Sequence, residues 1–280
     1  MVRRQELTDR SWAEIAPLLP AGGRPRDRWG EHRPPISLAV SQPACVAYDV
    51  AANVTAHAAM VRAAGSRVVV FPELSLTGYH LDASPIAVAD PRLAPLIDAC
   101  TDAGAVALAG APVRDEDGTM YIAMLSITEA GAIVAYRKMW LGGAEAARFA
   151  PGSTPAAIEV DGWRLGLAIC KDTGVRQHAS ATAALGIDAY VAGVVESASD
   201  KDVIVERARR ISVEHGVWVG VASFAGSTGG GYEHTAGRSA IWAPGGRRVA
   251  QVGWEAGETT RAVLTHTLQR PTTPPQRTGP

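Results

Sequence analysis

Three residues of the types needed for nucleophilic catalysis stand at the ends of apolar runs in this sequence. Glu73 follows the run RVVVFP, Lys138 closes AIVAYRK, and Cys170 closes GLAIC. A carboxylate can act as a general base, an ammonium group can stabilise developing negative charge, and a thiol can act as the nucleophile. Taken singly, a solvated loop acid, a surface lysine and a buried free cysteine are the commoner explanations. Taken together, they predict one site, provided that the strands carrying them are neighbours.

The runs that end in these residues belong to a regular alternation of strand and helix patterns. We expect strands at 36–42, 67–73, 105–113, 120–131, 132–141, 163–170, 187–195, 217–226, 239–244 and 247–253, and helices at 49–64, 91–103, 179–185 and 201–214. Most of the strand runs are apolar on both faces, which is typical of buried strands in a layered α/β domain. Such domains bind ligands beyond the carboxyl ends of their strands, where Glu73, Lys138 and Cys170 are expected.

The words that contain the three residues resemble those of the nitrilase superfamily of carbon–nitrogen hydrolases. FPELSLTGY contains the glutamate, YRKMWL the lysine and LGLAICKD the cysteine. Gln42, Asn53 and the segment 149–152 also match, and so do the later stretches ERARRISVEHGVWVGVAS and AGRSAIWAPGGRRVAQ. The resemblance extends over residues 36–268, and three motifs in the family's order make it specific.

This resemblance implies an α/β fold of the four-layer αββα sandwich type, paired into a homodimer or a higher homo-oligomer. It also implies that Glu73 is the general base, Cys170 the nucleophile that forms a thioester, and Glu145 a second glutamate that positions the substrate and the lysine. The oxyanion would be stabilised by the Lys138 ammonium and the backbone N–H of Lys171. The implied partner is a small-molecule amide, and the resemblance implies no metal and no organic cofactor.

The residues after the cysteine depart from the commonest family pattern, and this bears on the substrate. Lys171 stands where an aromatic residue is frequent, and residues 173–177 replace a common Arg-aromatic-Pro-Glu run. Strict nitrilases usually have Trp-Glu after the cysteine, so we expect an amide substrate, hydrolysed with release of ammonia or an amine. An N-carbamoyl amino acid or amine is an alternative substrate, because the same triad serves that reaction. A catalytically silent binding protein on this fold is a second alternative.

Residues near the three motifs are candidates for the substrate pocket. They are Tyr79, His80, Trp140 and Phe149. Core packing explains each of them at least equally well, because large aromatic side chains are usually buried. The glycine-rich segment Gly226–His234 lacks the Gly-Lys-Ser/Thr ending of a phosphate-binding loop, so we interpret it as a flexible loop at the edge of the site.

Two rival sites use the same cysteine. A Cys–His hydrolase would pair Cys170 with His178, His215 or His234, but none of these stands in a recognisable nucleophile–base motif. A metal site built from Cys170, Asp172 and His178 has poor spacing. Both therefore rank below the Glu–Lys–Cys hypothesis.

The composition excludes several classes of protein. The 280 residues include 27 Lys and Arg against 28 Asp and Glu, a formal net charge of −1 that argues against a nucleic-acid binder. Three separated cysteines are too few for a disulfide framework or a four-cysteine zinc site. The sequence shows neither a signal peptide nor an apolar run of about 18 residues. We therefore expect a cytoplasmic protein that does not bind membranes.

The ends of the chain differ from its body. Residues 1–35 contain seven Arg, five acidic residues and five Pro, with a helix-like stretch at 7–19. Their words LTDRSWAEIAPLLP and GRPRD resemble the N-terminus of certain insertion-sequence transposases, which we interpret as an upstream fusion or a mis-set start. Their net charge of only +2 is too small for phosphate binding. We expect a hydrolase domain at 36–268, outside which lie this extension and a disordered tail at 269–280.

Overall fold

Two six-stranded mixed sheets carry the fold in the computed structural model, which describes residues 34–266. The first sheet has the order β12-β1-β2-β3-β4-β5, with β1 Ile36–Gln42, β2 Val68–Val70, β3 Val106–Arg114, β4 Met120–Thr128, β5 Gly131–Arg137 and β12 Glu258–Leu264. The second has the order β11-β10-β9-β8-β7-β6, with β6 Ala157–Val160, β7 Trp163–Ile169, β8 Ala189–Val194, β9 Trp218–Ser223, β10 Ala240–Trp242 and β11 Arg248–Gln251. In each sheet three central strands are parallel (β1-β2-β3 and β7-β8-β9), and the outer strands pair antiparallel.

Within residues 34–266, four α-helices flank the sheets, and short 3₁₀ helices stand in the connections between elements. The α-helices are α2 Val50–Ala64, α3 Ala94–Ala103, α4 Arg176–Ala183 and α5 Lys201–His215, and the 3₁₀ helices are η3 Pro91–Leu93, η4 Glu145–Ala147, η5 Cys170–Gly174 and η6 Ala198–Asp200. Helix α2 begins where the Asp49 side chain accepts a hydrogen bond from the Ala52 N–H, and it ends at Gly65, which has a φ of 55°.

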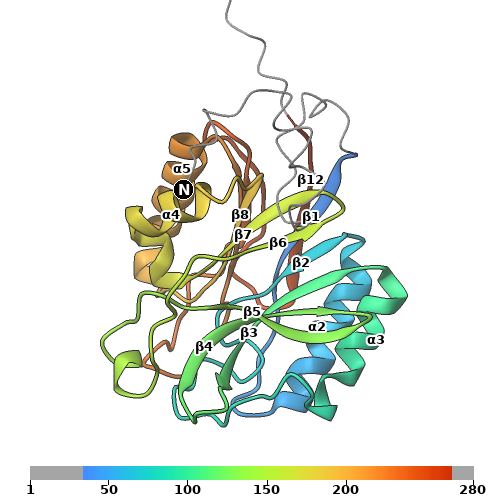
Figure 1. Cartoon of the computed structure of the whole chain (residues 1–280), viewed down its shortest axis with the longest axis vertical. Helices are drawn as coiled ribbons and strands as arrows, with labels where there is room; N and C mark the ends of the chain where they lie inside the picture. Colours follow the sequence, from blue (N-terminus) through green and yellow to red (C-terminus); the bar gives the residue numbers. More distant parts are fainter. Residues whose placement is uncertain (1–33, 267–280) are drawn as a thin grey trace, which may run out of the picture. The chain divides into compact units, whose positions relative to one another are not determined.

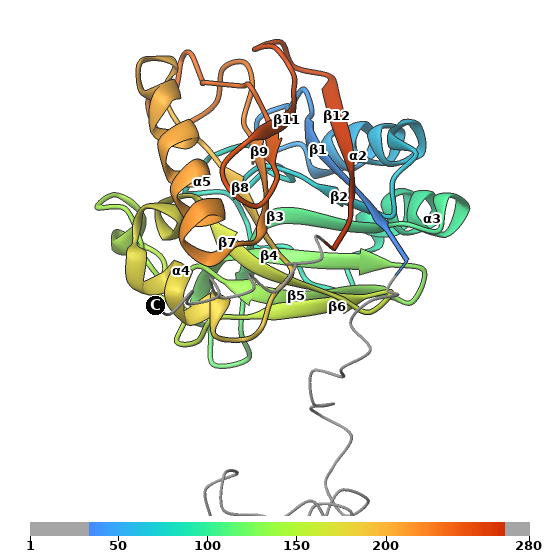
Figure 2. The ribbon, with the colours of Figure 1, turned by 90° about the horizontal axis from the view of Figure 1, so that it is seen from above.

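Three apolar clusters divide residues 34–265 into four layers. One cluster lies between the two sheets and joins side chains such as Val40 of β1 to Leu167 of β7. A second lies between the first sheet and helices α2 and α3, and a third between the second sheet and helices α4 and α5. Figures 1 and 2 show the two helical pairs on opposite sides of the strands. The predicted four-layer αββα sandwich is thus confirmed.

Most predicted elements are present, and the differences lie at the sheet edges. The expected strands and helices correspond to β1–β5, β7–β11 and α2–α5, with shifts of a few residues at their ends. Strands β6 and β12 were not predicted; they are outer strands with polar residues and partial exposure, so their sequences lack a continuous apolar run.

The predicted extension at 1–35 and tail at 269–280 lie almost wholly outside the described residues, and so do the helix-like stretch and the transposase-like words. Residues 34–265 form one compact unit. The domain boundaries and the homo-oligomer stay predictions. Among the helices of the described residues, none is long and apolar enough to cross a membrane.

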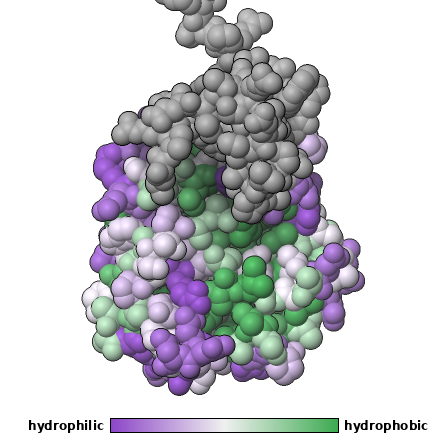
Figure 3. Space-filling model, viewed as in Figure 1, coloured by the Kyte–Doolittle hydropathy of each residue, from purple (hydrophilic) through white to green (hydrophobic). Residues whose placement is uncertain are grey.

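Strand β5 is an outer strand of the first sheet and is only partly covered. Its residues are mostly half-buried, and Ile133 has 61% of its surface exposed. Figure 3, drawn in the view of Figure 1, shows apolar side chains gathered in the region where Figure 1 labels β5. This strand therefore leaves apolar surface open in the single chain.

Candidate active site

Glu73 lies between the two sheets, just beyond β2. Its backbone is enclosed by two glycines: a Cβ atom on Gly110 of β3 would lie 2.8 Å from the Glu73 carbonyl carbon, and one on Gly193 of β8 would lie 3.0 Å from the Glu73 nitrogen. Real Cβ atoms rarely approach backbone so closely, so both positions require glycine. Asn53 of α2 fixes the loop that follows Glu73, because its side chain donates to the Leu76 carbonyl at 3.2 Å. The glutamate is thus positioned by close backbone packing from both sheets.

Lys138 follows β5 directly and bridges two glutamates. Its Nζ donates to Glu73 Oε1 at 2.6 Å and to Glu145 Oε1 at 2.7 Å, and all three side chains are at most 3% exposed. Its backbone N–H donates to the Ile122 carbonyl of β4, so the lysine is held in register with the sheet. Although burial disfavours the charged form, the nearby negative groups, first that of Glu73, raise the pKa of Lys138 above its usual range. The lysine is therefore a fixed cation at the centre of the cluster.

The two glutamates that share Lys138 have different surroundings. Glu145 accepts hydrogen bonds at both oxygens. Its Oε1 accepts from Tyr79 Oη at 2.6 Å and from Lys138, and its Oε2 accepts from the Gly142 N–H at 2.6 Å. Glu73 accepts only from Lys138, and its buried Oε2 has no hydrogen-bond partner among the described residues. An unpartnered buried carboxylate oxygen favours the protonated form.

This difference separates the pKa values of the two carboxyl groups. Burial raises the pKa of Glu73 to about 8, helped by the charges of Glu145 and Asp172 and opposed by Lys138. Burial also acts on Glu145, but Lys138 and the hydrogen bonds outweigh it and lower its pKa. Glu145 is thus a permanent anion, whereas Glu73 can gain and lose a proton near neutral pH.

Cys170 opens the turn η5 immediately after β7 in the second sheet. Its φ is 42°, in the left-handed region that costs a residue with a Cβ about 1–2 kcal/mol. Residues held in such conformations cluster at functional sites. The thiol is half-buried and donates to the Val195 carbonyl at 3.3 Å. Burial and the Glu73 charge raise the pKa of Cys170, while Lys138 lowers it, so the thiol and both side chains act on one another electrostatically.

The three strands that carry these residues are not adjacent strands of one sheet. Strands β2 and β5 belong to the first sheet and are separated there by β3 and β4, while β7 belongs to the second sheet. The site forms because the two sheets pack face to face, so that loops from both meet at their common edge. Lys138 and Cys170 also stand one residue beyond their strands, which end at Arg137 and Ile169.

Asp172 of η5 ties the cysteine turn to the lysine segment. Its Oδ2 accepts from the Ile169 N–H at 2.9 Å and from Tyr136 Oη at 2.8 Å, and its Oδ1 accepts from the Trp140 N–H at 2.9 Å. Behind it, His178 Nε2 lies 2.9 Å from Tyr136 Oη, and His178 Nδ1 lies 2.9 Å from Tyr190 Oη.

These contacts bear on the two rival sites. Both ring nitrogens of His178 face tyrosine hydroxyls, which leaves neither to accept the Cys170 proton. His215 ends α5, and His234 is exposed in a loop. Asp172 holds backbone N–H groups rather than a ligand. Within the described residues, no group of three or more His, Cys, Asp and Glu side chains is arranged to hold a metal ion.

The four pocket candidates occupy different places. Tyr79 reaches the cluster through its hydroxyl bond to Glu145. The His80 ring stacks on Tyr48 at 4.3 Å between ring centroids. The Trp140 ring packs edge-on against His178, and Phe149 is 4% exposed in the core between the sheets. Phe149 donates its backbone N–H to the Glu145 carbonyl at 2.9 Å. Of these four residues, within the part of the chain described, Tyr79 alone bonds to a side chain of the candidate catalytic cluster.

The loop Gly226–His234 packs on the Tyr79 segment. Thr228 Oγ1 accepts from the Tyr79 N–H at 2.8 Å, and the Tyr232 ring meets the Tyr79 ring edge-on at 5.4 Å. Burial raises the pKa of Tyr232 to about 12, with contributions from the charges of Cys170, Glu196, Glu73 and Glu145. The loop therefore borders the site through its contacts with Tyr79.

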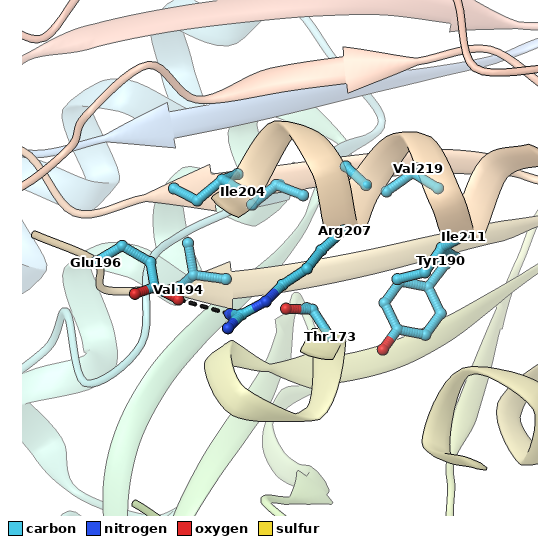
Figure 4. A pocket seen from close by; sticks show the side chains of 10 residues that line it. Thr173, Tyr190, Val194, Glu196, Ile204, Arg207, Ile211 and Val219 are labelled. Carbon is cyan, nitrogen blue, oxygen red and sulfur yellow. Dashed lines mark hydrogen bonds and ion pairs between the residues drawn. The ribbon is translucent and has the colours of Figure 1, made fainter. Parts of the chain in front are cut away.

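Sequence reasoning missed Glu196, which stands two residues beyond β8. It pairs with Arg207 of α5 at 2.6 Å, as Figure 4 shows, and its charge also raises the pKa of Cys170. A carboxylate just past a buried strand is the signal that identified Glu73, and it applies equally to Glu196. The cavity beside this pair, lined also by Thr173 and Tyr190, has a volume of about 10 Å³. It has room for about one water molecule and is too small for a substrate.

Comparisons with known proteins place the chain among carbon-nitrogen hydrolases. The family model for carbon-nitrogen hydrolases matches residues 37–277. A protein of Pseudomonas protegens described as a hydrolase in the pqqF 5′ region is 28% identical over 234 residues, 79% of each chain. An (R)-stereoselective amidase of a Pseudomonas species is 31% identical over 150 residues, 51% of this chain and 54% of that protein. The transposase-like resemblance of the first residues finds no support in these comparisons.

Solved structures share the fold at low sequence identity. Nit3 of Saccharomyces cerevisiae, a member of branch 10 of the nitrilase superfamily, superposes with a TM-score of 0.74 at 23% identity, covering 82% of this chain and 90% of that one. A Cys-to-Ala variant of the amidase from Nesterenkonia sp., in complex with butyramide, gives a TM-score of 0.74 at 21% identity, with coverage of 82% and 90%. With the family match extending over most of its length, the chain belongs to the carbon-nitrogen hydrolase family of the nitrilase superfamily.

Proposed function

We propose that this protein hydrolyses a small amide at a carbon–nitrogen bond other than a peptide bond, through a thioester on Cys170. The observation that carries this proposal is the asymmetry around Lys138. One of its two glutamates is fully hydrogen-bonded and anionic, and the other has an unpartnered oxygen and a pKa raised to about 8. Two carboxyl groups with separated pKa values beside a nucleophile are the arrangement that divides acid–base work from charge stabilisation.

In the first step the Cys170 sulfur attacks the amide carbonyl carbon, and the thiol proton passes to Glu73. A base is required because the pKa of Cys170 is raised by burial and by the Glu73 charge, so the resting thiol is neutral. Glu73 suits this role because its free oxygen needs no hydrogen bond broken before it accepts a proton.

The carbonyl oxygen becomes an oxyanion, which two donors stabilise. The first is the Lys138 ammonium, and the second is the backbone N–H of Lys171. This N–H lies in the first turn of η5, where no earlier carbonyl of the same helix serves as its partner. Donors of this kind each contribute about 3–4 kcal/mol of transition-state stabilisation. Glu145 holds the lysine in place, because its own bonds to Tyr79 and Gly142 fix it.

Glu73 then returns its proton to the departing nitrogen, and ammonia or an amine leaves. The product of this half-reaction is a thioester between Cys170 and the acyl group. In the second half, Glu73 takes a proton from water, the hydroxyl oxygen attacks the thioester, and the sulfur leaves as the thiol on receiving that proton. The net change is amide plus water to acid plus ammonia or amine.

Relatives that are named amidases support an amide substrate over a nitrile. One is the stereoselective amidase of Pseudomonas, and another is the Nesterenkonia amidase, which binds butyramide in a variant without its cysteine. N-carbamoyl compounds are the second candidate class, since the same four side chains would act on a carbamoyl carbon. A silent binding protein is a weaker candidate, because binding alone needs no strained cysteine beside a buried base.

Ammonia release from a panel of small aliphatic amides, N-carbamoyl amino acids and nitriles tests this function. We expect turnover of amides that disappears in Cys170→Ala and persists in Cys45→Ala, a matched variant of another free thiol. Turnover that survives Cys170→Ala contradicts the mechanism. Binding of an amide with no turnover in the intact protein supports the silent alternative.

A further inference from the structure

The buried polar groups behind the cysteine form a chain of hydrogen bonds with a defined direction. Tyr136 donates its proton to Asp172 Oδ2, so its oxygen must accept from the other neighbour, His178 Nε2. His178 therefore carries its proton on Nε2, and its Nδ1 accepts from the Tyr190 hydroxyl. The chain thus runs from Tyr190 through His178 and Tyr136 to Asp172.

This direction requires a neutral imidazole. Protonated histidine would present a second N–H to the Tyr190 hydroxyl, whose own proton would then have no acceptor in the chain. Burial lowers the pKa of His178, although the Asp172 charge acts in the opposite direction. The titratable groups in contact with it or with its partners are Tyr136 of β5, Asp172 of η5 and Tyr190 of β8, and the charge of Arg210 of α5 acts on Tyr190.

Asp172, the last residue of this hydrogen-bond chain, binds both the lysine segment and the cysteine turn of the candidate active site. Asp172 accepts from Tyr136 and from the Trp140 N–H, which stand two residues before and two residues after Lys138. It also accepts from the N–H of Ile169, the residue before Cys170. One carboxylate therefore joins the lysine segment of the first sheet to the cysteine turn of the second.

We propose that His178, as the neutral Nε2–H tautomer, is a positioning residue of this hydrolase site. It fixes Tyr136, and through Tyr136 and Asp172 it sets the separation between the Lys138 ammonium and the Cys170 sulfur. His178 touches neither the substrate nor the reacting atoms. This inference rests on the proposed function of the site. It adds a residue that holds the lysine segment of one sheet and the cysteine turn of the other at the distance that catalysis needs.

Three variants test this role. His178→Phe keeps a ring but removes both nitrogens, and His178→Gln restores an N–H that can reach the position of Nε2. Trp218→Phe is the matched control. It removes the indole N–H bond to the Thr265 carbonyl at the start of β9, the end of the second sheet that lies away from Cys170. Thermal unfolding of the three proteins measures the loss of stability that each substitution causes.

Two readouts report on positioning rather than stability. The first is the rate of Cys170 alkylation by iodoacetamide as a function of pH, with mass spectrometry to separate Cys170 from Cys45 and Cys100; it needs no substrate. The second is kcat and KM for the best amide of the panel. In His178→Phe we expect alkylation and kcat to fall about tenfold or more, with KM little changed, because small displacements of reacting groups lower rates steeply. His178→Gln should recover part of both, and Trp218→Phe should keep both.

The alternative outcomes separate the two proposals. If His178→Phe, compared with Trp218→Phe at matched stability, keeps the wild-type alkylation profile and kcat, His178 has only a structural role and the inference fails. If no amide or carbamoyl compound is turned over by the wild-type protein, the proposed function fails. The alkylation profiles still decide whether His178 sets the environment of the Cys170 thiol.

Discussion

Two buried polar clusters meet at the edge of the sheets, and they differ in how completely their atoms are paired. In the cluster of Glu73, Lys138 and Glu145, one carboxylate oxygen has no partner among the described residues. In the chain from Tyr190 to Asp172, every hydroxyl and ring nitrogen takes part in a hydrogen bond. Incomplete pairing leaves a group free to exchange a proton, whereas complete pairing holds the backbone segments in place.

Removing the cation from the first cluster should have the largest effect. Lys138→Met leaves two buried carboxyl groups without their shared partner, and breaking a buried pair costs about 3–5 kcal/mol. We expect loss of amide hydrolysis and a correspondingly lower free energy of unfolding, measured by urea denaturation. Lys171→Met is the control, because that side chain is exposed and donates a hydrogen bond to the Leu141 carbonyl. Equal loss of stability in both variants would contradict the central place given to Lys138.

Exchanging each glutamate for glutamine should separate catalysis from stability. In Glu73→Gln the amide oxygen can still accept from Lys138 and no existing hydrogen bond is lost, so stability should fall less than in Glu145→Gln. The kcat should fall about 100- to 10,000-fold, because the general base is lost.

In Glu145→Gln the amide nitrogen must replace an oxygen that accepts from Tyr79, Lys138 or Gly142. We expect a loss of about 1–3 kcal/mol in stability from the unsatisfied donors. Unfolding curves and steady-state kinetics of the two glutamine variants, recorded side by side, check this contrast. It is lost if Glu73→Gln proves the less stable of the two.

The pH dependence of the reaction should report the unpaired carboxyl group. Glu73 must be deprotonated to act as a base, and its pKa is raised from 4.5 to about 8 by burial. The value of kcat/KM should therefore increase as pH rises through about 8 and level off above it. Initial rates between pH 5 and 10 measure this. A rise already complete near pH 5 would show that the base is not desolvated.

Shortening the paired chain at its far end should have the smallest effect. Tyr190→Phe removes the donor to His178 Nδ1 and should cost about 1 kcal/mol of stability, with a smaller loss of kcat than His178→Phe. Tyr121→Phe is the matched control, because the Tyr121 hydroxyl makes no hydrogen bond to any other residue in the described range. Thermal unfolding of both variants checks the difference. Equal unfolding temperatures would show that the Tyr190 hydroxyl contributes nothing to the hydrogen-bond chain.

Much of the fold could be predicted because its central strands have continuous apolar sequences. Runs such as Val68–Val70 and Ala189–Val194 are apolar on both faces, which only a strand buried between layers requires. Strand β12 could not be predicted in this way, because the segment Glu258–Leu264 is mixed in polarity. It becomes a strand by pairing antiparallel with β1, more than 200 residues earlier in the chain.

The sequence predicted which residues form the site better than it predicted how their strands are arranged. Glu73, Lys138 and Cys170 were found from their residue types and their places at strand ends, and their catalytic roles stay proposals. That β2 and β5 are not adjacent, and that β7 belongs to the other sheet, depends on strand order, which local sequence does not encode. Glu196 was overlooked although its position after β8 carries the same signal as Glu73.

The family, the alternation of strands and helices, and the side chains that could do chemistry were all predictable from the sequence, because they follow from residue type, local periodicity and motif. The tertiary structure alone decided which carboxyl group can exchange a proton. Glu73 and Glu145 are the same residue type and share one lysine, yet their pKa values move in opposite directions. The reason is that desolvation and hydrogen bonding act through neighbours such as Tyr79 and Gly142, and folding alone brings these neighbours to one carboxylate and not to the other.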